Sequence, residues 1–164
     1  MHLPNPRNSV ILVDLFKKEE MKYSLFLLFA FFGTLASAQS ILGKWKSVDD
    51  ETGNERSVVE IYEKEGKYYG KVLSIFTAEG EDPDPVCQEC DEDDPRYMNK
   101  VIGMEIIQDM ELSKGGDVYE EGTILDPENG SVYDCKLWVE DGNLKVRGYI
   151  MFLYRTQTWL PIRS

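Results

Sequence analysis

Two cysteines, Cys87 and Cys90, form a CxxC pair inside the acidic stretch DPDPVCQECDEDDP, residues 82–95. A pair with this spacing can act as a redox motif, supply two ligands to a metal ion, or close a small disulfide loop. A reactive thiolate needs positive surroundings, but eight acidic residues lie between positions 81 and 94. Their negative field raises a thiol pKa and therefore opposes redox catalysis at this pair.

The residues near this pair do not complete a recognisable metal site. Structural zinc sites usually have four Cys or His ligands, and only two are local. The run Asp91–Asp94 lacks the glycine and the distal glutamate of an EF-hand calcium loop. Because the only histidine is His2, imidazole-dependent catalysis is excluded from the rest of the chain. We expect no metal and no cofactor, and the dispersed acidic residues nominate no catalytic carboxylate pair.

Residues 21–38, MKYSLFLLFAFFGTLASA, have the three parts of a secretory signal peptide. A basic start is followed by a short apolar run and by small residues that end at Ala38, after which we expect cleavage. Residues 1–20 do not fit this pattern, and we interpret them as a mis-called N-terminal extension. Residues 39–164 then form a single exported domain, in the periplasm or outside the cell.

Export makes a disulfide the default state of neighbouring cysteines, because the compartments it reaches are oxidising. We therefore expect Cys87 and Cys90 to bond to each other. Cys135 lies on the apolar face of an expected strand, where a buried free thiol acts as a small hydrophobic group. The alternative, in which Cys135 pairs with one of the other two cysteines, stays open.

The expected domain is strongly acidic. Residues 39–164 carry 14 Lys and Arg residues against 27 Asp and Glu residues. Nucleic acids and anionic membranes repel such a surface, so we expect neither as a partner. The sequence carries no signal for an oligomeric state.

Short alternating runs separated by turn residues follow from Ile41 onward, which is typical of an all-β protein. The clearest turns contain Pro127 with Asn129-Gly130, and Asp141-Gly142. Eight antiparallel strands in this length predict a single up-and-down barrel, with one long acidic loop at 77–100. The expected strands are 41–48, 56–63, 67–76, 103–112, 118–125, 131–140, 143–152 and 154–160.

Alternation assigns one face of each strand to the barrel interior. The expected inward residues of two strands are Tyr133, Cys135, Leu137, Val139, Leu144, Val146 and Ile150. Eight strands lie at the boundary between a barrel filled by side chains and one that encloses a ligand. If there is a cavity, aromatic side chains are expected to line it, and the candidates are Tyr62, Tyr69, Tyr133, Trp138 and Tyr149.

Five short motifs occur along the chain in a distinctive order: GKW (43–45), GMEII (103–107), GTILDPENG (122–130), KVRGYI (145–150) and RTQTW (155–159). Together they resemble the bacterial secreted family catalogued as domain of unknown function 2147. The resemblance covers nearly all of residues 39–164 and implies a lipocalin-like β-barrel exported to the periplasm or beyond. It implies no activity, because none is established for the family.

The resemblance also implies a contact between Trp45 and Arg155. In lipocalin-like barrels the tryptophan of Gly-x-Trp is often covered by an arginine from the last strand, which closes one barrel end. Stacking of this kind contributes roughly 0.5–2 kcal/mol. We expect the pair to close the barrel rather than to bind a ligand.

The sequence supports three functional hypotheses. The first is a non-enzymatic exported protein that binds a small apolar or amphipathic ligand in its barrel. The second is a structural or envelope-interaction protein with a filled barrel, and the third and least favoured is a carboxylate-based enzyme. An open apolar lumen above about 300 Å³ favours the first, whereas a packed interior favours the second.

We expect mass spectrometry of the protein from its own host to find Gln39 at the N-terminus. Because translation is expected to start at Met21, no peptide from residues 1–20 should be detected. Detection of any such peptide would contradict the interpretation of this segment as a mis-called extension.

Overall fold

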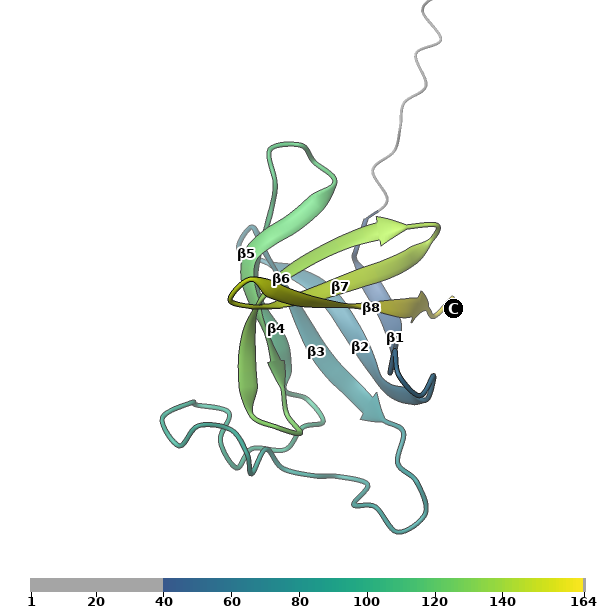
Figure 1. Ribbon diagram of the computed structural model, residues 1–164, viewed down its shortest axis with the longest axis vertical. Coiled ribbons are helices and arrows are strands. Elements are labelled where there is room, and N and C mark those ends of the chain that lie inside the picture. Colours follow the sequence, from purple (N-terminus) through teal and green to yellow (C-terminus); the bar gives the residue numbers. More distant parts are fainter. Residues whose placement is uncertain (1–39, 164) are drawn as a thin grey trace, which may run out of the picture. The chain divides into compact units, whose positions relative to one another are not determined.

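The computed structural model describes residues 40–163, which form one closed β-barrel (Figure 1). The expected N-terminal extension, 1–20, and the expected signal peptide, 21–38, lie outside the described residues. The eight strands are β1 (Gly43–Val48), β2 (Glu55–Lys64), β3 (Lys67–Ile75), β4 (Glu105–Leu112), β5 (Val118–Asp126), β6 (Ser131–Glu140), β7 (Asn143–Ile150) and β8 (Leu153–Pro161).

The strands follow one another around the barrel in sequence order, and neighbouring strands are antiparallel. The first and last strands also pair, with Trp45 of β1 opposite Pro161 of β8. The Ile162 amide extends this ladder by donating to the Lys44 carbonyl at 2.9 Å. The predicted all-β, up-and-down barrel is therefore confirmed. In the described part of the chain, no helix is long and apolar enough to cross a membrane.

The β7–β8 turn is the connection that the sequence marks least clearly. The sequence predicts one strand over 143–152, but β7 ends at Ile150 and the chain reverses at Met151 and Phe152. Met151 has a φ of 54°, which is uncommon for a residue that is not Gly, Asn or Asp. Two apolar residues with exposed side chains therefore form this turn.

Apolar side chains fill the barrel from the end that contains Trp45 to about its middle. Their mutual burial supplies most of the folding energy, on the order of 1.5–3 kcal/mol for each large side chain. Ile150 departs from the expectation because it lies at the barrel rim, where it is 56% exposed. The buried inward residues are Trp45, Val59, Ile61, Val72, Ile107, Met110, Cys135, Leu137, Leu144, Val146 and Trp159.

The acidic segment between β3 and β4, residues 76–104, has defined structure, although its many charged residues suggest a loop that is exposed to solvent throughout. Val86 and Lys100 form an isolated antiparallel bridge, and Cys87 and Cys90 form the predicted disulfide. Both cysteines are buried, whereas most of the surrounding carboxylates face water. The segment therefore has a small apolar interior of its own beneath an acidic surface.

The same segment packs against the turn between β5 and β6. At Gly130, a Cβ atom would lie 1.7 Å from the Glu89 carbonyl oxygen, so only glycine permits this approach. Leu125 faces outward on β5, yet it is buried beside this contact. The acidic segment thus covers part of the outside of the barrel.

We expect Gly130→Ala to destabilise the protein more than Gly53→Ala. The φ angles of the two glycines are nearly equal, 70° and 73°, but a Cβ at Gly53 meets nothing within 4 Å. Each substitution therefore carries the same cost of about 1–2 kcal/mol for placing an alanine at positive φ. At Gly130 alone, the clash of the new Cβ with the Glu89 carbonyl adds about 1–3 kcal/mol. Urea unfolding measures both variants, and equal losses would contradict a close packing of the acidic segment.

Candidate functional site

One of the five aromatic residues expected to line a cavity, Tyr133, faces the barrel interior. It pairs with Ile124 and alternates with the exposed Val132 and Asp134. The expectation is wrong for the other four, which alternate with inward residues and therefore lie on the outer surface. These four are Tyr62, Tyr69, Trp138 and Tyr149.

Polar partners explain why these rings are stable on the outside. The Tyr62 hydroxyl donates to the Glu105 carboxylate, and burial together with this carboxylate raises the pKa of Tyr62. The Tyr69 hydroxyl donates to Asp109 at 2.9 Å. An aromatic ring fits either face of a strand when its polar edge reaches a partner, so composition could not assign the face.

Trp45 and Arg155 are not in contact, which corrects the expected closing pair. Trp45 is buried, and its Nε1 donates to the Ile41 carbonyl at 2.7 Å. On β8 it lies opposite Pro161, whereas Arg155 lies six positions earlier, about 20 Å away along the strand. The RTQTW motif begins at the other end of the barrel, so its arginine meets a different partner. A closing role for Trp45 itself stays a prediction.

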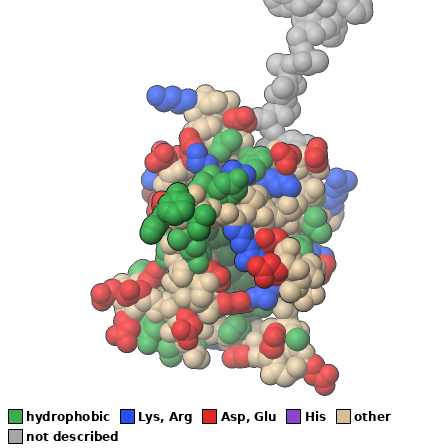
Figure 2. Space-filling model, in the orientation of Figure 1, with side chains coloured by type: hydrophobic (Ala, Val, Ile, Leu, Met, Phe, Trp, Pro, Cys, Tyr) green, Lys and Arg blue, Asp and Glu red, His purple; other side chains and the backbone are tan. Residues whose placement is uncertain are grey.

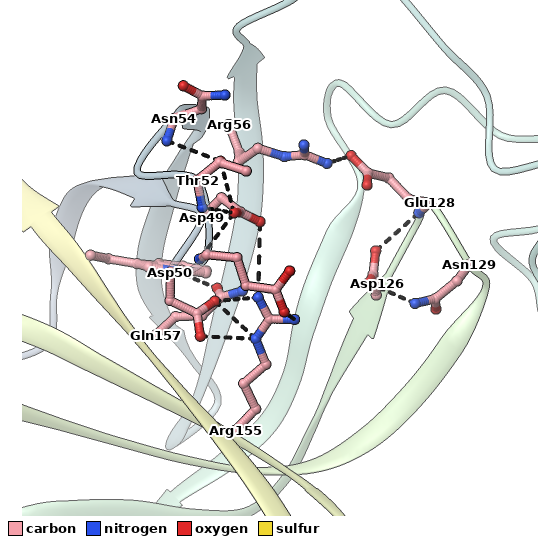
Figure 3. Close-up of polar contacts among 12 residues, drawn as sticks. Asp49, Asp50, Thr52, Asn54, Arg56, Asp126, Glu128, Asn129, Arg155 and Gln157 are labelled. Atoms are coloured by element: carbon pink, nitrogen blue, oxygen red, sulfur yellow. Dashed lines mark hydrogen bonds and ion pairs between the residues drawn. The ribbon is translucent and has the colours of Figure 1, made fainter.

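Polar and charged side chains replace apolar ones at that other end, where β1 ends and β8 begins (Figure 3). Arg155 and Gln157 share the inward side of β8 with the buried Trp159. The Arg155 Nε donates to the two Asp50 carboxylate oxygens at 2.8 and 2.9 Å. We call this end the polar mouth, and its members are Ser47, Asp50, Ser57, Asp126, Arg155 and Gln157.

The loop between β1 and β2 positions the partner of Arg155. Asp49 accepts hydrogen bonds from the Thr52 amide at 2.7 Å and from its hydroxyl at 2.8 Å, which fixes the loop and lowers the pKa of Asp49. The Arg155 guanidinium lowers the pKa of Asp50 through their hydrogen bonds. Glu51 adds a third carboxylate, 3.5 Å from Arg155. The arginine is therefore held on an acidic rim.

Asp126, at the end of β5, is the third ionisable group of the polar mouth, after Asp50 and Arg155. Its carboxylate accepts hydrogen bonds from the Asn129 side chain at 2.9 Å and from the Glu128 amide at 3.1 Å. Burial raises the pKa of Asp126, although Arg56 and Arg155 favour its ionised form. Its carboxyl group therefore takes up a proton at a higher pH than an ordinary aspartate does.

The polar mouth lies directly above the apolar interior. The Ser47 and Ser57 hydroxyls share a hydrogen bond of 2.7 Å, and the Trp159 Nε1 donates to Gln157 at 2.9 Å. These bonds satisfy the polar groups nearest the apolar floor. Figure 2 shows a hollow on the face where β8 begins, with acidic and basic side chains on one side and apolar side chains on the other.

The cysteines contribute no reactive group to this site. Cys135 is a free, buried thiol, and burial raises its pKa to about 12, so it stays protonated and unreactive. The alternative disulfide through Cys135 is wrong, because Cys87 and Cys90 bond to each other. Within residues 40–163, no group of three or more His, Cys, Asp or Glu residues is arranged to hold a metal ion.

A closed, eight-stranded, up-and-down barrel with Gly-x-Trp in its first strand is a lipocalin-like β-barrel. The chain belongs to the bacterial family described as "Uncharacterized protein conserved in bacteria (DUF2147)", which matches residues 43–160. The barrel is similar in structure to protein HP1028 from the human pathogen Helicobacter pylori, which belongs to the lipocalin family. The TM-score is 0.63 at 18% identity, over 76% of this chain and 84% of that chain. No curated protein matches the chain.

Sequence reasoning missed most of the polar mouth. Asp50 follows β1 and Asp126 ends β5, and nothing in the sequence distinguishes them from the many other acidic residues. Gln157 was detectable, because it alternates with Thr158 and shares the inward face of Trp159. Polar inward positions at one end of a strand are therefore the signal that could have located the mouth.

We expect Arg155→Gln to lower the free energy of unfolding by up to about 1 kcal/mol at pH 7, since both partners are partly exposed. A lowered folded-state pKa at Asp50 means that its stabilisation is present above the ordinary value of 3.8 and is lost as the pH falls below it. The difference between wild type and variant should therefore shrink in acid. Urea unfolding at pH 7, 4 and 3 measures it, and Lys114→Gln at the other barrel end is the control. A difference that does not change with pH would contradict the ion pair.

Proposed function

We propose that the protein is an exported binding module that holds a small amphipathic ligand in the polar mouth. The apolar part of such a ligand meets the floor of the mouth, and its polar group meets Arg155 and Asp126. No covalent chemistry is part of this proposal. The lipocalin-like fold supports it, because barrels of this size hold small molecules at one open end.

The observation that carries the proposal is the change from apolar to polar and charged side chains along the inner wall of the barrel. On β8 the inward residues run from the buried Trp159 through Gln157 to Arg155, whose side chain remains about half exposed. An arginine on the inward face of a barrel strand is costly unless it meets a polar partner. Here the partner is a loop carboxylate at the rim, which a ligand group can replace or join.

The mouth is a better candidate for the binding site than the deep lumen. The inward side chains on the Trp45 side are buried against one another. A hollow of ≈ 250 Å³ beside Trp45 and another of ≈ 220 Å³ outside β5 and β6 are both smaller than the ~300 Å³ of a typical ligand pocket. We therefore place the ligand at the loop end of the barrel, above the packed core.

The packed interior also favours a second candidate function. A barrel filled by its own side chains suits a structural or envelope-interaction protein that presents its surface to a partner. In that case Arg155 and Asp50 only tie the β1–β2 loop to β8. The two candidates differ in whether a small molecule occupies the mouth.

Native mass spectrometry of the protein purified from its own host tests the proposal. We expect a bound mass on the wild type, reduced at least about tenfold by Arg155→Gln, because the variant loses a charge-assisted contact. Lys114→Gln lies at the opposite barrel end and should retain the bound mass. A wild type without any bound mass, or equal retention by both variants, would contradict binding in the mouth and favour the filled-barrel alternative.

A further inference from the structure

The five most exposed large apolar side chains of residues 40–163 are consecutive and form the end of the β7–β8 hairpin. Met151 and Phe152 are each 86% exposed, Leu153 and Tyr154 are each 62% exposed, and Ile150 is 56% exposed. Figure 2 shows apolar side chains protruding at this position beside the hollow. Runs of exposed apolar residues are unusual on a protein surface unless they meet a partner. We call residues 150–154 the apolar tip.

The outer face of β6, β7 and β8 continues directly from this tip. Strand register places nine outward residues in three rows, with three basic residues against one acidic residue. Lys136 forms an ion pair with Glu120 at 2.7 Å and Lys145 lies 3.7 Å from Glu140, so Arg147 is the basic residue of these rows without a carboxylate partner in residues 40–163. The rows, which we call the outer patch, are Asp134, Tyr149 and Tyr154; Lys136, Arg147 and Thr156; and Trp138, Lys145 and Thr158.

Arg147 occupies the centre of the outer patch. Its Cζ lies 4.9 Å from the centroid of the Trp138 ring and 4.3 Å from that of the Tyr154 ring. Its Nε donates to the Thr156 hydroxyl at 2.8 Å, and no carboxylate within residues 40–163 forms an ion pair with it. The two rings and the hydroxyl orient the guanidinium, while its Nη groups keep donors for an external acceptor.

We propose that the apolar tip inserts into a zwitterionic phospholipid surface and that the outer patch contacts its headgroups. Met151 and Phe152 enter the boundary between headgroups and acyl chains. Tyr149 and Tyr154 lie at the headgroup level, where amphipathic rings are favoured. Arg147 donates hydrogen bonds to lipid phosphate oxygens.

The shape and chemistry of the hairpin favour a fluid lipid surface over a protein partner. A protruding tip fits a fluid interface without a complementary pocket, and interfacial segments bury their apolar side to about 5–10 Å. Arg147 lies four residues before Met151, about 13 Å along the strand. Its guanidinium lies closer to the tip than this backbone separation, because its Cζ is 4.3 Å from the centroid of the Tyr154 ring. The guanidinium and this ring therefore share the headgroup level when the tip reaches the acyl boundary.

The net negative charge of the molecule favours a zwitterionic lipid surface over an anionic one. An anionic surface repels a chain with a net charge of −12, so strongly acidic lipids are disfavoured. A zwitterionic headgroup carries a phosphate for Arg147 without adding net negative charge. Insertion is then driven by apolar area rather than by long-range attraction, and it depends little on salt.

Cosedimentation of the protein purified from its own host with phosphatidylcholine vesicles tests the inference. We expect the wild type to bind and the double variant Met151→Ser, Phe152→Ser to bind at least about tenfold more weakly, because most of the inserted apolar area is lost. Arg147→Gln should weaken binding several-fold. Leu112→Ser, which removes an exposed apolar side chain at the opposite barrel end, should bind as the wild type does.

Circular dichroism checks that each variant keeps the β-barrel, since the tip contributes little to the core. A wild type that does not bind the vesicles, or a tip variant that binds equally well, would overturn the inference. Tighter binding to vesicles that contain phosphatidylglycerol would overturn the choice of a zwitterionic lipid. Analytical ultracentrifugation showing a dimer that the tip variant abolishes would instead assign the tip to a second copy of the chain.

Discussion

The pairing of β1 with β8 is the constraint on which the rest of the structure depends. An eight-stranded sheet that stays open has two unpaired edges, and closure removes both. Here the join consists of Trp45 opposite Pro161 and Lys46 opposite Leu160, extended by the Ile162 amide. Closure turns one side of every strand inward, so it decides which side chains form the core, which form the mouth and which remain outside.

An eight-stranded barrel encloses only enough space for its own side chains or for one small ligand. In this chain, large apolar residues fill the Trp45 side of the barrel, and short or polar residues occupy the inward positions near the other end. Polar groups such as Gln157 and Arg155 can occupy inward positions there because loop carboxylates and solvent reach them. The loops that complete the polar mouth therefore stabilise the polar inward side chains of the barrel, and they also form part of the proposed site.

Local patterns in the sequence predicted much of the fold. Strands, turns and the inward face of β6 follow from alternation and from residues such as Asn129-Gly130 that prefer turn conformations. The disulfide between Cys87 and Cys90 also followed from the expectation of export, because close cysteines in an oxidising compartment pair locally. The turn at Met151 was unmarked, since only cross-strand pairing forces that residue into a left-handed conformation.

The sequence by itself determined the all-β class, the acidic composition and the presence of a single histidine, His2, because composition and period-two alternation are local properties. Tertiary structure alone decided which rings face outward, that Arg155 meets Asp50 rather than Trp45, and that apolar residues gather at one exposed tip. These outcomes depend on strand register around a closed barrel, which relates residues about a hundred positions apart, and no local pattern encodes that distance.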